Sequence, residues 1–189
     1  SMINSLAPLY FGIIMGICLL SILILTILII LNLRKNYKIK QMYTNVWNQL
    51  ENIINLRKLK DSTTLKISED KAYDFYLESR THIYYIKVVP NFKNDEICVN
   101  NKTKWQIIKN MTNANLFVEN IDGLMNLDIS YPTKKIVRKL YIIYPNANVL
   151  LKYINECEIV FIYPETDVYG CNVITYQNLI EHPECIEGK

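Results

Sequence analysis

A long uncharged segment near the N-terminus dominates the hydrophobic pattern of the chain. Leu9 to Leu31 is a run of 23 residues without a charged residue or a proline. At about 1.5 Å per residue, such a helix spans a hydrocarbon core of about 30 Å. A cleavable signal peptide has basic residues before a shorter apolar core. We therefore predict a transmembrane helix over residues 9–33, behind a short extracytoplasmic N-terminus of residues 1–8.

Four cations fix the predicted direction of that helix. Arg34, Lys35, Lys38 and Lys40 follow the apolar run, and no cationic side chain precedes it. The positive-inside rule then places residues 34–189 in the cytoplasm. Residues 34–41 are predicted to be a basic juxtamembrane linker that contacts anionic membrane lipid. The spacing of Gly12 and Gly16 allows a second helix to approach closely, which favours a homo-oligomer or a protein partner.

Composition separates the chain into two parts and excludes several classes of protein. All 21 Lys+Arg and 18 Asp+Glu residues follow Leu33. The remaining length of about 150 residues suits one globular domain, predicted over residues 42–189. A net charge of +3 does not by itself indicate nucleic-acid binding. The five cysteines are odd in number and form no CxxC pair, so we expect neither a zinc site nor a disulfide framework.

Helical spacing of apolar residues recurs in four segments of this domain. The clearest is an amphipathic helix over residues 42–56, with Glu51 at the border of its apolar stripe. A second helix is predicted after Pro132, reaching Tyr144. Shorter helices are predicted over residues 147–154 and 176–181.

Segments rich in β-forming residues alternate with these helices. The strongest pair covers residues 72–78 and 83–89, joined by a short hairpin loop and ended by Pro90. Weaker strands are predicted at residues 65–68, 97–99, 159–163 and 173–174, the third of them buried. Residues 104–111 fit a strand or a helical turn, and residues 112–131 are polar and irregular. This order predicts a mixed α/β layer fold.

The strand pair carries the most informative polar residues. Alternation with period two places Asp74, Tyr76 and Glu78 on one face of their strand. Tyr85 and Lys87 share a face of the partner strand. A simple hairpin register sets Asp74 opposite Lys87, with Glu51 supplied by the preceding helix.

This order resembles the PD-(D/E)xK nuclease core and, more narrowly, the nuclease-related domain (NERD) family. The similarity covers roughly residues 43–182 in short motifs: NQLENIINLRKL with Glu51, YDFYLE with Asp74, YYIKVV with Lys87, NDEICVNNKTKWQI with Trp105, YPTKKIVRKL and CEIVFIYPETDVYGCNVITYQNLIEH. The resemblance implies a restriction-endonuclease-like mixed sheet flanked by helices. It also implies that the carboxylates hold Mg²⁺ while the lysine activates water.

The sequence departs from that pattern at the metal site. Tyr85 stands where the family has a second carboxylate, and a phenol with a pKa of about 10 is neutral at pH 7. Such a group is a poor ligand for Mg²⁺. Glu78 lies about 13 Å along the strand from Asp74 and would have to shift to replace it. We therefore interpret Glu51, Asp74 and Lys87 as a remnant catalytic site, with Asp74 and Glu51 as weak metal ligands and no resident cofactor.

Three functions remain open at this point. The first is a single-pass membrane protein whose degenerate nuclease-like domain is a binding or assembly module. The second is an active membrane-tethered, Mg²⁺-dependent nuclease with a relocated carboxylate. The third is a structural subunit of a membrane complex. Nucleic acid and protein are both open as partners.

Overall fold

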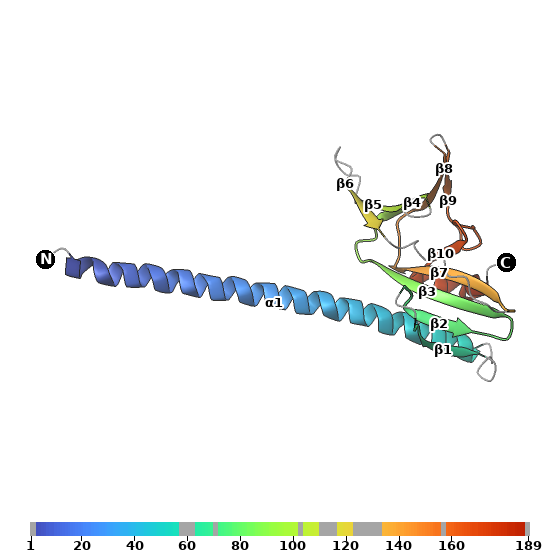
Figure 1. The fold of residues 1–189 in the computed structure, drawn as a ribbon, viewed down its shortest axis with the longest axis horizontal. Coiled ribbons are helices and arrows are strands. Elements are labelled where there is room, and N and C mark those ends of the chain that lie inside the picture. Colours follow the sequence, from blue (N-terminus) through green and yellow to red (C-terminus); the bar gives the residue numbers. More distant parts are fainter. Residues whose placement is uncertain are drawn as a thin grey trace. The chain divides into compact units, whose positions relative to one another are not determined.

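The computed structural model describes residues 3–56, 63–69, 72–101, 104–109, 117–122, 134–155 and 158–187. It divides into two compact units, Ser1–Gln41 and Met42–Lys189, which are described separately. Both contain part of helix α1 (Ile3–Leu56), which runs without a break through the apolar segment (Figure 1). The predicted linker of residues 34–41 is therefore helical.

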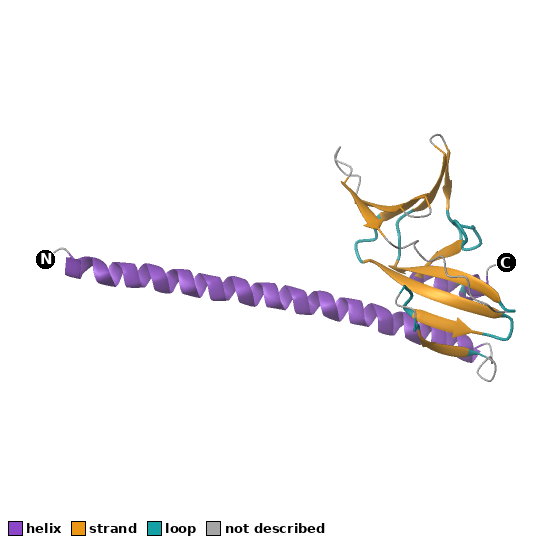
Figure 2. Ribbon diagram, viewed as in Figure 1, coloured by secondary structure: helices purple, strands orange, loops and turns teal. Residues whose placement is uncertain are grey.

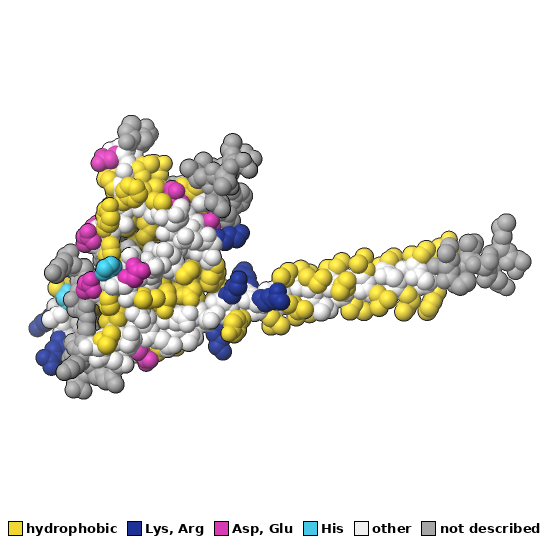
Figure 3. Space-filling view, turned by 180° about the vertical axis from the view of Figure 1, so that it is seen from behind, with side chains coloured by type: hydrophobic (Ala, Val, Ile, Leu, Met, Phe, Trp, Pro, Cys, Tyr) yellow, Lys and Arg dark blue, Asp and Glu magenta, His cyan; other side chains and the backbone are white. Residues whose placement is uncertain are grey.

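In the first unit, apolar side chains are exposed around the whole helix. From Tyr10 to Leu33 every described side chain is exposed. Figure 3 shows this apolar surface, with Lys and Arg gathered where it ends. Among the described residues, one helix, near the N-terminus, is long and apolar enough to cross a membrane. Exposed apolar area of this kind is stable against lipid and unfavourable in water.

The second unit contains two mixed five-stranded sheets (Figures 1 and 2). The first sheet has the order β1-β2-β3-β7-β10, with antiparallel pairs from β1 to β3 and parallel pairs from β3 to β10. Its strands are β1 (Thr64–Ile67), β2 (Phe75–Glu78), β3 (His82–Asn91), β7 (Ile136–Pro145) and β10 (Cys171–Thr175).

The second sheet has the order β6-β5-β4-β8-β9, in which only β4 and β8 are parallel. Its strands are β4 (Glu96–Asn101), β5 (Lys104–Lys109), β6 (Phe117–Asp122), β8 (Leu150–Asn155) and β9 (Glu158–Phe161). Helix α2 (Tyr176–Glu181) follows β10, and a 3-10 helix, η2 (Pro183–Glu187), follows α2. The coarse prediction of a mixed α/β fold is confirmed.

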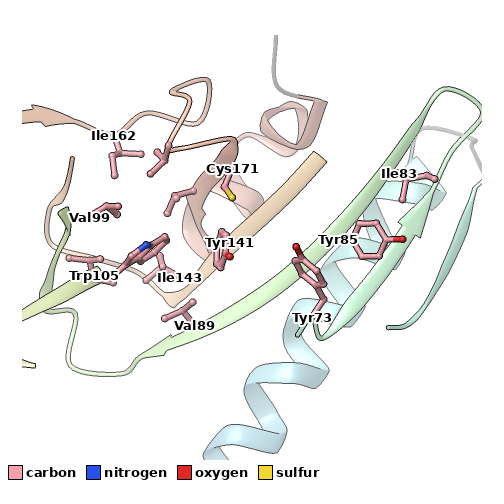
Figure 4. Packing of buried hydrophobic residues seen from close by; sticks show 13 residues of the cluster. Tyr73, Ile83, Tyr85, Val89, Val99, Trp105, Tyr141, Ile143, Ile162 and Cys171 are labelled. Atoms are coloured by element: carbon pink, nitrogen blue, oxygen red, sulfur yellow. The ribbon is translucent and has the colours of Figure 1, made fainter. Parts of the chain in front are cut away.

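The central strands of the first sheet are covered on both faces. The end of α1 packs on one face, where the rings of Tyr43 and Trp47 lie 6.1 and 5.6 Å from the ring of Phe75. The other face belongs to the core that it shares with residues of the second sheet (Figure 4), in which Trp105 is fully buried 5.1 Å from the ring of Tyr141. The predicted apolar stripe of residues 42–56 is confirmed.

Two predicted helices are strands. The prediction of a helix after Pro132 is wrong for the described residues, because Ile136–Pro145 is the strand β7, between β3 and β10. The helix over residues 147–154 is also wrong, because β8 begins at Leu150. Leu140, Tyr141, Ile142 and Ile143 are all buried. A strand buried on both faces is apolar without alternation, and such a run also satisfies the i, i+3, i+4 spacing of a helix.

Pro90 does not end its strand, contrary to the sequence prediction. β3 continues through Pro90, which pairs with Tyr144 in the ladder with β7. The amides of the even-numbered residues of β3 point toward β2, as Val88 N shows by donating to Asp74 Oδ2. β2 does not extend alongside Pro90, so the missing N–H of proline costs no ladder hydrogen bond.

Three further expectations are resolved by the second sheet. Residues 104–109 form the strand β5 rather than a helical turn. Part of the segment predicted to be irregular forms β6, and its remainder lies outside the described residues. The strand predicted at residues 159–163 exists as β9, but it is an edge strand and mostly exposed, so its predicted burial is wrong.

The central position of β7 gives a stability prediction. Ile142→Ala should lower the free energy of unfolding by about 2–5 kcal/mol, because it opens a cavity at a side chain with 0% exposure. Ile136→Ala is the control on the same strand, since Ile136 is 55% exposed. Urea unfolding of the full chain in detergent micelles, followed by tryptophan fluorescence, measures both. Equal losses for the two variants would contradict the burial of β7.

Candidate functional site

The hairpin between β2 and β3 brings Asp74 and Lys87 together. Phe75 pairs with Ile86, and the amide of Asp74 donates to the carbonyl of Ile86 at 2.9 Å. This register places Asp74 opposite Lys87, whose Nζ lies 3.4 Å from Asp74 Oδ1. Both side chains are partly buried. The contact is the one that the simple hairpin register predicts.

The second oxygen of Asp74 is also engaged. Oδ2 accepts a 2.7 Å hydrogen bond from the backbone N–H of Val88. The carboxylate therefore takes the place of a strand carbonyl at the point where β2 begins. Asp74 also meets Tyr43 of α1. The pKa of the Tyr43 phenol is raised, first by burial and then by the charge and hydrogen bond of Asp74. These contacts join helix, hairpin and lysine at one carboxylate.

Tyr85 belongs to an aromatic cluster beside this pair. Its side chain is only 7% exposed. Its ring lies 5.0 Å from the ring of Tyr73 and 5.3 Å from that of Tyr76, and Figure 4 shows Tyr73 and Tyr85 together. Tilted and edge-on contacts of this kind stabilise aromatic pairs. The position at which the nuclease pattern has a carboxylate is thus filled by a packed ring.

Glu78 is held by a cation that spacing alone did not reveal. Its Oε1 lies 2.6 Å from Lys135 Nζ, and its Oε2 accepts a 2.6 Å hydrogen bond from the phenol of Tyr76. Lys135 also donates to the carbonyl of Ser79 at 2.8 Å. The pKa of Glu78 is lowered from its ordinary value of 4.5, first by the hydrogen bond from Lys135 and then by that from Tyr76. Burial and Glu78 in turn raise the pKa of Tyr76. The sequence separation of the two charged residues hides this ion pair from any short motif.

Glu51 lies apart from the other two predicted site residues. It is exposed and lines a shallow hollow of about 420 Å³ with Ile54, Asn55, Thr63 and Leu65. It follows Tyr43, the residue that touches Asp74, by eight positions, which is about 12 Å along a helix axis. No hydrogen bond or ion pair joins Glu51 to Asp74 or Lys87 within the described residues.

These donors do not fit a magnesium ion. Mg²⁺ requires near-octahedral oxygen coordination, with one or two carboxylates that face it. Asp74 already binds an ammonium group and a backbone amide, Tyr85 contributes a ring, and Glu51 lies elsewhere. Across the described part of the chain, no group of three or more His, Cys, Asp or Glu side chains is placed to hold a metal. We therefore derive no reaction step through a metal.

No family model, curated protein or solved structure matches the chain.

The hydrogen bond from Val88 gives a prediction for Asp74. Asp74→Ala should cost about 1–3 kcal/mol of unfolding free energy, because it leaves a buried N–H without its acceptor. Asp74→Asn should cost less, since the amide oxygen still accepts from Val88. Thermal unfolding of the full chain in detergent measures both, with Glu69→Ala as the exposed control. An Asp74→Ala variant as stable as the wild type would show that the carboxylate does not stabilise the hairpin.

The ion pair of Glu78 gives a pH prediction. Because its pKa is lowered on folding, Glu78 contributes stability above pH 4.5 that is lost as the pH falls through the folded pKa. The melting temperature of the wild type should therefore fall more steeply with acid than that of Glu78→Gln. The exposed Glu165 supplies the matched control, Glu165→Gln, which should keep the wild-type slope. Identical acid profiles for all three proteins would contradict the role of the Lys135 pair.

Proposed function

We propose that the chain is a single-pass membrane protein with its N-terminus outside and a cytoplasmic, nuclease-like domain that acts as a binding or assembly module. The apolar exposed helix and the four cations that follow it support the membrane anchor and its direction. The motif order of the nuclease-related family supports the ancestry of the domain.

The contacts of Asp74 support the proposal that the domain does not cleave phosphodiesters. A catalytic carboxylate must present an oxygen to a metal, but both oxygens of Asp74 are used inside the fold. Lys87 pairs with Asp74 at 3.4 Å, so its charge is balanced inside the fold. The nearest candidate replacement, Glu78, has its own cation and phenol. The residues of the motif have become part of the packing of the hairpin.

The proposed partners follow from the helix and the basic residues behind it. Arg34 and Lys38 line a stripe with Ile30, Leu33 and Tyr37, which suits the boundary between acyl chains and anionic headgroups. Gly12 and Gly16 have open space around them, so a second copy of the helix can approach closely. Nucleic acid is a third candidate partner, and it would bind with strong salt dependence.

A cleavage assay tests the proposal. The full chain in detergent micelles, incubated with DNA or RNA and Mg²⁺ or Mn²⁺, should give no more cleavage than the Lys87→Ala variant. Lys152→Ala is the matched control, because Lys152 lies on β8, outside the candidate site. Robust metal-dependent cleavage that is lost in Lys87→Ala and kept in Lys152→Ala would defeat the binding-module proposal and favour an active nuclease.

A further inference from the structure

A polar hollow lies away from Asp74, between the end of β7 and α2 on one side and the strands β8 and β9 on the other. Its volume is about 340 Å³, which falls within the usual range of about 300–1,000 Å³ for ligand pockets. The lining includes the amides of Asn146, Asn148 and Gln177, the carboxylate of Glu181, and the rings of Phe161 and Tyr163. None of the described side chains that line it is Lys, Arg or His.

Two exposed aromatic side chains line the hollow. Phe161 and Tyr163 are 60% and 58% exposed, whereas Ile162 between them is buried in the core. The chain stays extended here, since the amide of Ile162 donates to the carbonyl of Leu150 at 2.9 Å. Alternation therefore places both rings on the same side. Exposed neighbouring rings of this kind are a feature of recognition surfaces, because burying them in the protein core would be favourable.

Hydrogen bonds link several polar side chains that line the hollow. Gln177 Nε2 donates to Glu181 Oε1 at 2.7 Å, and Gln177 Oε1 accepts from Asn146 Nδ2 at 3.3 Å. These bonds link three side chains, each of which has further donor or acceptor capacity for a ligand. Asn148 is exposed and makes no hydrogen bond within the described part of the chain. Thr175 and Asn178 line the same hollow, but they satisfy each other as the cap of α2.

We infer that this hollow binds a neutral saccharide. Closely spaced amide donors and acceptors match hydroxyl groups, each of which both donates and accepts. The flat face of an exposed aromatic ring matches the C–H face of a sugar ring. Phosphate and carboxylate ligands are disfavoured because no cation lines the site. An extended peptide is disfavoured because the rings lie on an open surface and offer no enclosed pocket for a side chain.

This inference rests on the proposed function, because it names the ligand class of the binding module. It involves none of the residues around Asp74. Failure of saccharide binding would therefore leave the cleavage result unchanged, and cleavage would not alter the saccharide result. The two experiments can be run on one preparation of the full chain, in a detergent without a sugar headgroup.

The test is binding to an immobilised array of neutral oligosaccharides of glucose, galactose, mannose and N-acetylglucosamine. We expect retention of at least one of them, with apparent affinity lowered about tenfold or more by Phe161→Ala and by Tyr163→Ala, since aromatic anchors dominate binding energy. Tyr163→Phe should retain most of the affinity because the ring remains. Ile159→Ala is the matched control, because Ile159 is 48% exposed on β9 and does not line the hollow.

Two results would overturn the inference. One is no binding to any neutral oligosaccharide by the wild type. The other is binding that both aromatic-to-alanine variants retain. Peptide arrays, probed in parallel, would reveal a peptide ligand, and binding there instead of to saccharides would also overturn it. Both replaced rings are exposed, so the two alanine variants should keep the melting temperature of the wild type. Their loss of binding would then not be caused by unfolding.

Discussion

The burial of β3 and β7 on both faces is the constraint on which the rest of the domain depends. One face of their sheet is covered by the apolar stripe of α1 and the other by residues that include Trp105 of the second sheet. A central strand pair of this kind contains few polar side chains, and each of these needs a partner. Lys87 meets this requirement through Asp74, at the edge where β2 begins. The ion pair is thus a consequence of the layer structure.

The same constraint explains why a motif that resembles a nuclease motif need not form a catalytic site. In a metal-dependent nuclease, the carboxylate before the strand and the lysine on the next strand face a shared ion. Here Asp74 faces the lysine and a backbone amide, and the ring of Tyr85 packs between Tyr73 and Tyr76. The attraction between Asp74 and Lys87 therefore stabilises the hairpin itself.

Sequence reasoning succeeded where the pattern is local. The hairpin register that joins Asp74 to Lys87 follows from period-two alternation and a short loop, and α1 follows from its apolar stripe. It failed at β7, because burial on both faces erases alternation and leaves a run that also fits a helix. It also missed the pair of Glu78 and Lys135, since only the parallel pairing of β3 with β7 brings them together. Glu51 was grouped with Asp74 by chain order, whereas the axial rise of the helix separates them.

The polar groups of the domain therefore fall into two kinds with different physical meaning. Asp74, Glu78 and Lys135 are partly buried, and they form their hydrogen bonds and ion pairs with other groups of the fold. Asn148, Phe161 and Tyr163 are exposed around a hollow. Exposed aromatic rings cost solubility and expose an edge strand to aggregation, a liability that proteins otherwise reduce with charges or proline. The inferred saccharide would cover both rings and reach the free amide of Asn148, at the junction of β7, β8, β9 and α2.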